Sequence, residues 1–429
     1  MSKKIIKGSS TPFRGEITPP GDKSISHRSL ILGSLANGHS VVKDFLISDD
    51  TLSTANAMRA LGITIGINGT QVDITGKGLY GLSEPEKVID CGNSGTTTRL
   101  LTGLLSAQTF TSILDGDKYL QARPMRRVVG PLSLMGAQIE GKEDGNKLPL
   151  TITGKKLKGI RYELPVASAQ VKSAILLAGL YADGETEVIE PEPSRDHTEK
   201  MLSYLGVSIQ KNGNSIKINK TREINPGEII VPADISSAAF FIVAALITPG
   251  SEVLIKNVGI SPLRTGIIDI LKNMGGDIEI INQREVNKEP IGDILTRSSD
   301  LHGTEISGEL IPKAIDELPI AAVAACFAEG ETRIRDAKEL RVKETDRIKA
   351  MATELGKLGA RVLEFEDGMS IHGSRSLTGA VCSSWGDHRI AMSIAIAGTR
   401  AKGETQILDA ECVSVSYPGF FKIIDELRQ

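Results

Sequence analysis

Residues 227–256 read GEIIVPADISSAAFFIVAALITPGSEVLIK and contain one complete structural unit. A short β-type run ends at a proline, a polar segment with Asp234 and Ser236 follows, and the apolar run 238–247 leads to a turn at Gly250. Asp and Ser at a helix start accept hydrogen bonds from the first free backbone N–H groups. The run 252–255, EVLI, contains the β-branched residues Val253 and Ile255 and is typical of a strand. The stretch therefore predicts the order strand, helix, turn, strand.

The same order of features occurs six times along the chain, which indicates a repeat architecture. Polar helix starts lie at residues 21–24, 92–96, 167–172, 233–237, 315–319 and 386–389. The turns after these helices are centred on Gly38, Gln108, Gly184, Gly250, Gly330 and Gly403. After each turn we expect a strand and a second helix. Five of the second helices end in Leu-Gly or Met-Gly, at residues 61–62, 135–136, 205–206, 274–275 and 358–359. Glycine at that position suits a left-handed C-cap.

The repeats predict two domains. The sixth repeat ends at Gln429 before any closing strands, while residues 15–22, GEITPPGD, resemble residues 227–234. We therefore expect residues 1–20 to supply strands that complete the last repeat. The six repeats then form an α/β protein with one domain at residues 21–232 and another at residues 1–20 plus 233–429. Two crossings near Pro20 and Pro232 join them, and 429 residues suffice for two separate cores.

Composition argues against several classes of protein. The formal net charge is −3 and aromatic residues make up 4%, which disfavours a basic, base-stacking nucleic-acid surface. The longest apolar run, 238–247, is shorter than the roughly 18 residues of a membrane span, and no apolar signal segment is visible at the N-terminus. The four cysteines form no CxxC pair and no zinc-type cluster with histidine. A cytoplasmic protein without a structural metal is therefore expected.

The helix starts are the expected place for chemistry, because free N–H groups and the helix dipole favour anions there. Cations recur at or near these starts and at the second-helix starts, namely Lys23, Arg28, Arg123, Lys172, Arg195, Lys343, Arg347 and Arg389. A slightly acidic chain that gathers cations at equivalent repeat positions indicates a site for a small polyanion.

Each motif alone also has a plainer interpretation. Residues 23–28 are compatible with a capped, solvated first turn, residues 92–96 with an ordinary turn, and residues 341–347 with a charged helix face carrying a Glu344–Arg347 pair. Asp316 is harder to explain in this way. It lies between a segment around Pro312, expected to be extended, and an apolar helix, where a carboxylate at a domain boundary suggests function.

Seven motifs, in order, resemble the 5-enolpyruvylshikimate-3-phosphate synthase family (3-phosphoshikimate 1-carboxyvinyltransferases) over essentially the whole chain. They are GDKSISHR at 21–28, NSGT at 93–96, RPM at 123–125, SAQ at 168–170, SRDHTE at 194–199, RVKETDR at 341–347 and DHR at 387–389. The resemblance implies two domains of three βαβαββ repeats, an inverse α/β prism. It also implies transfer of the enolpyruvyl group of phosphoenolpyruvate to the 5-hydroxyl of shikimate 3-phosphate, through a tetrahedral intermediate and with release of phosphate. No metal or organic cofactor is implied, and a cytoplasmic monomer in the shikimate pathway is expected.

The resemblance also implies roles for individual residues. The implied shikimate 3-phosphate site consists of Lys23, Ser24, Arg28, Ser168, Ala169, Gln170, Arg195, Asp316 and Lys343. The implied phosphoenolpyruvate site consists of Lys23, Gly95, Arg123, Gln170, Arg347 and Arg389. Asp316 is the expected base at the 5-hydroxyl and Glu344 the expected acid, and Lys23 is expected to assist catalysis by touching both substrates. These roles agree with the physics, since arginine forks bind carboxylate and phosphate in pairs and lysines act as movable point charges.

The chain departs from the family pattern in places, and two alternatives stay open. Ala169 stands where many members have a second serine, so only its backbone can contribute, and Glu411 stands where some members have a lysine. The first alternative is UDP-N-acetylglucosamine enolpyruvyl transferase. That family carries a reactive cysteine before the Arg-Pro motif, but residues 115–125 contain none. The second is a non-catalytic polyanion-binding protein, which would gain from losing Asp316 and Glu344.

Overall fold

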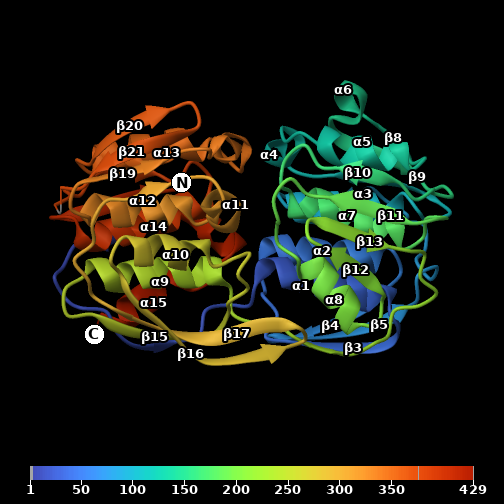
Figure 1. Cartoon of the computed structure of the whole chain (residues 1–429), viewed down its shortest axis with the longest axis horizontal. Helices are drawn as coiled ribbons and strands as arrows, with labels where there is room; N and C mark the ends of the chain where they lie inside the picture. Colours follow the sequence, from blue (N-terminus) through green and yellow to red (C-terminus); the bar gives the residue numbers. More distant parts are fainter. Residues whose placement is uncertain (1–2, 375, 429) are drawn as a thin grey trace. The chain divides into compact units, whose positions relative to one another are not determined.

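The computed structural model describes residues 3–374 and 376–428, so the chain ends at Met1 and Gln429 lie outside the described residues. The chain forms two compact units (Figure 1). Unit 1 comprises Met1–Pro20, Pro232–Glu285 and Pro290–Gln429, and unit 2 comprises Gly21–Val231 and Val286–Glu289. Each unit has its own cluster of buried apolar side chains.

Unit 2 contains three small sheets. The first consists of β14 (Glu228–Ile230), β3 (Asn37–Lys43), β5 (Gln71–Lys77) and β4 (Thr64–Asn68). The second consists of β6 (Ile89–Asp90), β7 (Thr111–Asp115), β9 (Lys147–Thr153) and β8 (Gln138–Gly141). The third consists of β10 (Arg161–Glu163), β11 (Thr186–Ile189), β13 (Ser215–Ile218) and β12 (Ile209–Asn212). In each sheet the first two strands are parallel and the others antiparallel.

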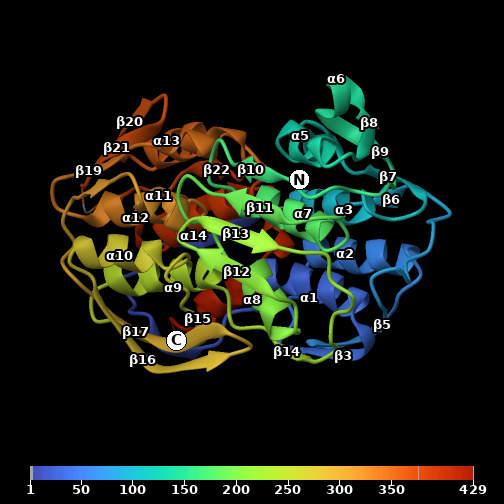
Figure 2. The same cartoon turned by 45° about the vertical axis from the view of Figure 1, so that its right-hand side comes forward.

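The helices of unit 2 follow the predicted alternation. The first helices of the three repeats are α1 (Lys23–Leu35), α3 (Gly95–Leu105) and α7 (Ala169–Gly179). The second helices are α2 (Asp49–Ala60), α5 (Arg126–Leu134) and α8 (His197–Tyr204), and short turns form α4 (Lys118–Gln121) and α6 (Lys142–Gly145). Figure 2 shows α3 and α7 side by side, and these two helices are in contact along their lengths.

Unit 1 is built in the same way. Its first sheet consists of β2 (Arg14–Ile17), β15 (Glu252–Gly259), β17 (Glu289–Arg297) and β16 (Asp277–Val286). Its second consists of β18 (Glu305–Ile306), β19 (Glu331–Ile334), β21 (Gly368–His372) and β20 (Arg361–Phe365). Its third consists of β1 (Lys3–Lys7), β23 (Glu404–Leu408) and β22 (Val381–Ser383). Its first helices are α9 (Ile235–Ile247), α12 (Leu318–Phe327) and α14 (His388–Arg400). Its other helices are α10 (Gly266–Asn273), α11 (Leu310–Ala314), α13 (Arg347–Lys357), α15 (Phe420–Glu426) and the 3₁₀ turns η1 (Lys338–Val342) and η2 (Ala410–Val415).

The predicted α/β repeat fold is confirmed, with six small sheets among the described residues. In unit 1 the apolar helices α9, α12 and α14 pack against one another (Figure 1), and every residue of α9 and α12 is buried. The Gly residues expected to end the second helices, at positions 62, 136, 206, 275 and 359, all have φ between 87° and 98°. This conformation is easy for glycine and costly for other residues, so these glycines end the helices as predicted.

The N-terminal strands do not all join the last repeat. Strand β1 pairs with β23 in the sixth sheet, but β2 pairs in parallel with β15 in the sheet of the fourth repeat. The prediction that residues 1–20 together complete the last repeat is therefore wrong for β2. Strand β14 plays the matching role in unit 2, where it pairs in parallel with β3. Each of these strands thus pairs in one unit just before the chain crosses to a helix of the other.

Two further features differ from or add to the expectations. The segment around Pro312, expected to be extended, is the short helix α11. Proline is tolerated there because the first helical turn leaves its N–H groups without intrahelical acceptors. The loop between β16 and β17 belongs to unit 2, where Asn287 accepts a hydrogen bond from the N–H of Ile230 and Glu289 pairs with His197 at 2.7 Å.

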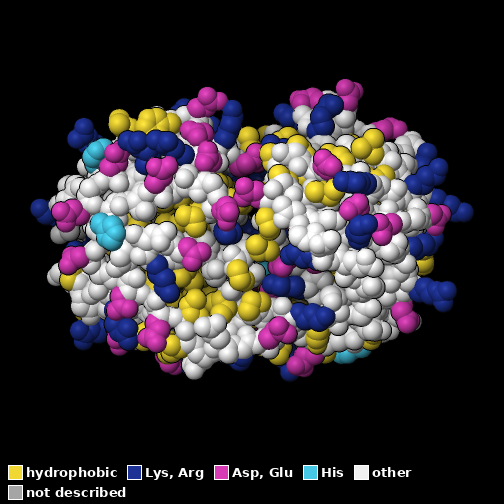
Figure 3. Space-filling view, viewed as in Figure 1, with side chains coloured by type: hydrophobic (Ala, Val, Ile, Leu, Met, Phe, Trp, Pro, Cys, Tyr) yellow, Lys and Arg dark blue, Asp and Glu magenta, His cyan; other side chains and the backbone are white. Residues whose placement is uncertain are grey.

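The described surface carries charges of both signs. Figure 3 shows Lys and Arg side chains interspersed with Asp and Glu on the viewed face of each unit, in keeping with the small net charge of −3. Across residues 3–374 and 376–428, none of the helices combines the length and apolar character needed to cross a bilayer.

Candidate active site

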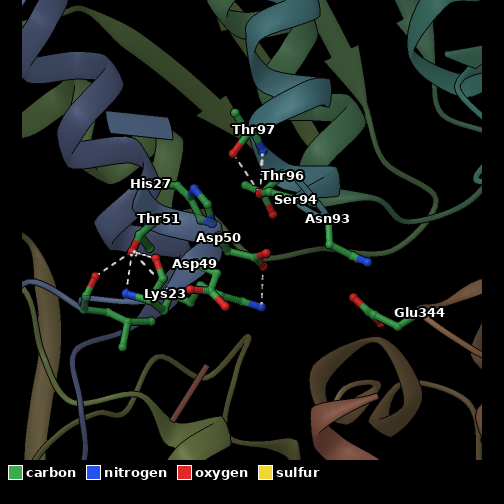
Figure 4. Close-up of polar contacts among 12 residues, drawn as sticks. Lys23, His27, Asp49, Asp50, Thr51, Asn93, Ser94, Thr96, Thr97 and Glu344 are labelled. Atoms are coloured by element: carbon green, nitrogen blue, oxygen red, sulfur yellow. Dashed lines mark hydrogen bonds and ion pairs between the residues drawn. The ribbon is translucent and has the colours of Figure 1, made fainter. Parts of the chain in front are cut away.

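The start of α1 in unit 2 presents Lys23 and Ser24. Asp22 caps the helix by accepting a hydrogen bond from the N–H of Ile25 at 2.9 Å. The Lys23 ammonium lies 3.0 Å from a carboxylate oxygen of Asp50 on α2, an ion pair that Figure 4 shows. The side chains of Lys23 and Asp50 are largely buried, and Ser24, the residue after Lys23, is half-buried. Asp50 thus holds Lys23 in place, a partner that the sequence motifs did not reveal.

Arg28 is buried one turn further along α1. Its guanidinium donates to the hydroxyl of Thr198 at 2.6 Å, the hydroxyl of Ser173 at 2.7 Å and the carbonyl of Ser24 at 2.9 Å. Burial lowers the pKa of Arg28 to about 10, although Glu199 nearby acts in the opposite direction. The Ser173 hydroxyl in turn bonds to the carbonyl of Ala169, so Arg28 links the start of α1 to the start of α7.

A second group of predicted residues gathers around Gly95 at the start of α3. A Cβ atom on Gly95 would lie 3.1 Å from a guanidinium nitrogen of Arg123 and 3.2 Å from one of Arg99. Arg123 donates to the side chain of Asn93, and Arg99 donates to Gln170 on α7. Gln170 donates to Thr96 at 2.9 Å. Predicted residues of three different segments therefore meet here, and only a residue without a side chain leaves the space between the two arginines open.

The start of α7 and the loop before α8 hold the remaining predicted residues of unit 2. The Ser168 hydroxyl caps α7 at the N–H of Val171, and Ser168, Ala169 and Gln170 are half-buried. Arg195 is also half-buried, in the loop before α8. The side chain of Glu190 accepts from the backbone N–H of Ser194, which fastens this loop next to Arg195.

Lys172 does not take part in this cationic surface. Its side chain is 0% exposed, and its ammonium lies 2.8 Å from Glu190 and 2.7 Å from Glu199. Burial alone would lower the pKa of Lys172, but Glu199 and Glu190 outweigh burial and raise it. Lys172 was expected among the cations that bind a polyanion. That expectation is wrong, because its position on α7 points it at two buried carboxylates, whose pairing stabilises the loop that carries Arg195.

A chain of buried hydrogen bonds connects α1, α2 and α3. His27 bonds through Nδ1 to Thr54 at 2.7 Å, Thr54 bonds to Thr97 at 2.6 Å, and Thr97 donates to the capping residue Ser94 at 2.7 Å. Figure 4 shows Thr97 turned toward Ser94. Burial, together with the positive charges of Lys23 and Arg28, lowers the pKa of His27 well below its usual value. A neutral His27 therefore helps to fix the helix starts at Lys23 and Gly95.

In unit 1 the predicted residues meet around Arg347, which begins α13. Its guanidinium contacts Glu344 at 2.6 Å, Asp387 at 2.8 Å and Asp316 at 3.2 Å. Lys343 lies 3.4 Å from the same oxygen of Asp316. Burial would lower the pKa of Arg347, but Asp387, Glu344 and Asp316 together raise it. The predicted Glu344–Arg347 pair is confirmed, although Glu344 precedes the helix instead of lying on its face.

Arg389 lies next to this cluster at the start of α14. It donates to the backbone carbonyl of Asp316 at 3.1 Å, while Asp387 caps α14 at the N–H of Arg389 and also bonds to Arg347. Asp316 and Glu344 are partly exposed, whereas both arginines are buried. Two accessible carboxylates are thus surrounded by fixed cations, an arrangement suited to moving protons near anionic substrates.

Sequence reasoning missed Asp50, Arg99 and Asp387. The position of Arg99, four residues after Gly95 on the same helix face, was a usable signal. Asp387 belongs to the DHR motif at 387–389, but its role depends on a contact with Arg347, 40 positions earlier in the chain. Among residues 3–374 and 376–428, no cluster of three or more His, Cys, Asp or Glu side chains is arranged to hold a metal ion.

Comparison with known proteins gives consistent matches. The sequence model of the EPSP synthase (3-phosphoshikimate 1-carboxyvinyltransferase) family matches residues 8–424. The 3-phosphoshikimate 1-carboxyvinyltransferase of Geobacter metallireducens is 58% identical over 97% of both chains. The enzyme of the same name from Geotalea daltonii is 59% identical over 96% of both.

Solved structures agree with these matches. EPSP synthase from Acinetobacter baumannii is 46% identical and superposes with a TM-score of 0.89, covering 99% of this chain and 98% of the other. The enolpyruvyl transferase NikO from Streptomyces tendae has a TM-score of 0.79 over 99% of this chain and 96% of its own. At 16% identity NikO shares the fold only.

Proposed function

Because this chain belongs to the EPSP synthase family, the 3-phosphoshikimate 1-carboxyvinyltransferases, we propose that it transfers the enolpyruvyl group of phosphoenolpyruvate to the 5-hydroxyl of shikimate 3-phosphate and releases phosphate. The observation that carries the proposal is the cluster of Asp316, Lys343, Glu344 and Arg347, in which carboxylates able to handle protons lie among cations able to bind phosphate and carboxylate.

In the proposed mechanism, Asp316 accepts the proton of the 5-hydroxyl while the hydroxyl oxygen attacks C2 of phosphoenolpyruvate. Glu344 donates a proton to the methylene carbon, which becomes a methyl group in a tetrahedral intermediate. The bond from C2 to the phosphate oxygen then breaks. The methyl group returns a proton to Glu344, and Asp316 passes its proton to the departing phosphate. Lys343 and Arg347 stabilise the charges that develop beside the two carboxylates.

The remaining predicted residues are proposed to bind the substrates. We assign Lys23, Ser24, Arg28, Ser168, Gln170, Arg195 and the backbone of Ala169 to shikimate 3-phosphate. We assign Lys23, Gly95, Arg123, Gln170, Arg347 and Arg389 to phosphoenolpyruvate. The gathering of Arg123 and Gln170 around Gly95 supports the second assignment, because it joins several donors at the N-terminus of α3.

The proposed residues are divided between the two units, so we propose that the units are separate domains that close on their substrates. Cations of both domains are assigned to the anionic substrates, so closure should depend on shikimate 3-phosphate and weaken with salt. Small-angle scattering with and without this ligand measures the change. An unchanged radius of gyration at saturating ligand would exclude closure. Gel filtration tests the further proposal of a monomer.

The activity is tested by phosphate release from phosphoenolpyruvate with shikimate 3-phosphate as acceptor. UDP-N-acetylglucosamine in place of shikimate 3-phosphate is the control for the related enolpyruvyl transfer. Release that requires shikimate 3-phosphate and is lost in Asp316→Asn supports the proposal. Release with the nucleotide sugar alone, or binding of shikimate 3-phosphate without any turnover, contradicts it.

A further inference from the structure

None of the predicted substrate residues lies at the start of α9 in unit 1. A hydrogen bond nevertheless links this helix start to the start of α12, next to Asp316. Asp234, Ser236 and Arg264 are buried together at this start. Arg264 donates to Asp234 at 2.9 Å and to the hydroxyl of Ser236 at 3.0 Å. The Ser236 hydroxyl in turn donates to the carboxylate of Glu317, at the start of α12. A buried polar network therefore leads from the fourth repeat to the residue next to Asp316.

Glu317 lies between two arginines. Its side chain is 0% exposed, and one carboxylate oxygen is 3.9 Å from guanidinium nitrogens of both Arg264 and Arg389. Its other oxygen is buried without a hydrogen-bond partner among the described residues. A buried carboxylate is stable only if nearby positive charge compensates it. Glu317 therefore depends on the positive charges of Arg264 and Arg389.

Glu317 also differs from the acids at the starts of α9 and α14, the other two first helices of the repeats in unit 1. Asp234 and Asp387 cap their own helices by accepting from backbone N–H groups at 2.8 Å. Glu317 makes no such bond to α12, whose second residue is a proline. Its carboxylate is turned instead toward Ser236, Arg264 and Arg389. Helix capping thus does not account for this acid.

We propose that Glu317 is a positioning residue that holds Arg389 and the Asp316 segment in place for the reaction. Arg389 donates to the carbonyl of Asp316 at 3.1 Å, and Glu317 is the next residue in the chain. The Arg389 guanidinium therefore lies next to both the Asp316 carbonyl and the Glu317 carboxylate. Ser236 and Arg264, at and near the start of α9, hold the Glu317 carboxylate in place. This inference rests on the proposed function for its kinetic test, but its structural test does not.

The test uses Glu317→Gln, which keeps the size of the side chain and an oxygen for Ser236 but removes the charge. KM for phosphoenolpyruvate should rise about tenfold while KM for shikimate 3-phosphate changes less than about twofold, because Arg389 is displaced. In an Arg389→Lys background the same change should alter KM for phosphoenolpyruvate by less than about twofold, since residues that act through one another are not additive. Glu317→Asp should recover part of the loss.

The matched control is Glu354→Gln, a buried carboxylate of the same unit that bonds to Lys357, Trp385 and Ser383, none of which is assigned to a substrate. It should lower thermal stability without the selective change in KM. Equal KM effects of Glu317→Gln in both backgrounds, or equal effects on both substrates, would overturn the positioning role.

A crystal structure of Glu317→Gln tests the inference independently of activity. We expect the Arg389 guanidinium to leave the carbonyl of Asp316. Retention of that hydrogen bond would refute the positioning role, even if the wild-type protein did not turn over the proposed substrates. A wild-type protein that fails to release phosphate, with Arg389 displaced in the variant, would reject the proposed function and keep the structural role of Glu317.

Discussion

Replacing Lys172 by methionine should destabilise unit 2 severely, because the lysine neutralises two buried glutamates. The ammonium lies 2.8 Å from Glu190 and 2.7 Å from Glu199, and the side chains of the three residues are 0%, 2% and 7% exposed. At an effective dielectric constant of about 20, each contact corresponds to about 6 kcal/mol, much of which is offset by desolvation of the charges. Removing one partner of such a buried group typically costs about 3–5 kcal/mol.

The loss in the free energy of unfolding is measured by urea denaturation of the wild type and Lys172→Met, with circular dichroism as the signal. Hydrogen exchange in α7 and α8 should rise in the variant, and the melting temperature should fall by roughly 10 °C for a unit of this size. The fluorescence of Trp385, the only tryptophan, reports on unit 1 and serves as an internal reference.

Two control variants separate charge loss from general damage. Lys217→Met removes a lysine that lies 2.7 Å from Glu185 on the surface, and should lower the free energy of unfolding far less than Lys172→Met does. Lys172→Met combined with Glu199→Gln leaves fewer unpaired charges and should recover about 1 kcal/mol or more. If Lys172→Met unfolded like wild type but bound shikimate 3-phosphate much more weakly, the lysine would be a ligand cation and the structural assignment would be wrong.

Three further predictions concern the proposed active site and its support. Asp316→Asn and Glu344→Gln should each lower turnover about 10²- to 10⁴-fold with little change in substrate binding, and near wild-type turnover between pH 6 and 9 in steady-state assays would remove the residue from proton transfer. Gly95→Ala should raise KM for phosphoenolpyruvate about tenfold, because the new methyl group would lie 3.1 Å from Arg123; the idea fails if KM is unchanged while the variant folds normally. The pKa of His27 is well below 6.5 in the folded state, so the unfolded state binds its proton first and His27 removes up to about 1.4 kcal/mol of stability per pH unit as the pH falls below 6.5. His27→Gln should therefore show a shallower loss of stability in acid denaturation, and an identical slope would show that His27 is not buried in its neutral form.

Much of the candidate site was predictable because its signals are local or recur with the repeat. The caps Asp22, Ser94 and Ser168 and the glycines after the second helices act on backbone groups a few residues away, so their chemistry can be recognised in the sequence. The resemblance of the motifs then supplied roles for residues at these helix starts, which no local pattern contains.

The choice of long-range partners was decided by the tertiary structure. Lys172 and Arg195 both looked like ligand cations, but only packing placed Lys172 between Glu190 and Glu199. Strand β2 pairs with β15 of the fourth repeat instead of the sixth, because the choice depends on which sheet of unit 1 offers a free edge. Glu317 had no predicted role, and its contacts depend on Ser236, Arg264 and Arg389, which lie far away in the chain. Local sequence therefore determines where helices begin and end, whereas the partner of a buried charge depends on which distant side chains the fold brings within a few ångströms.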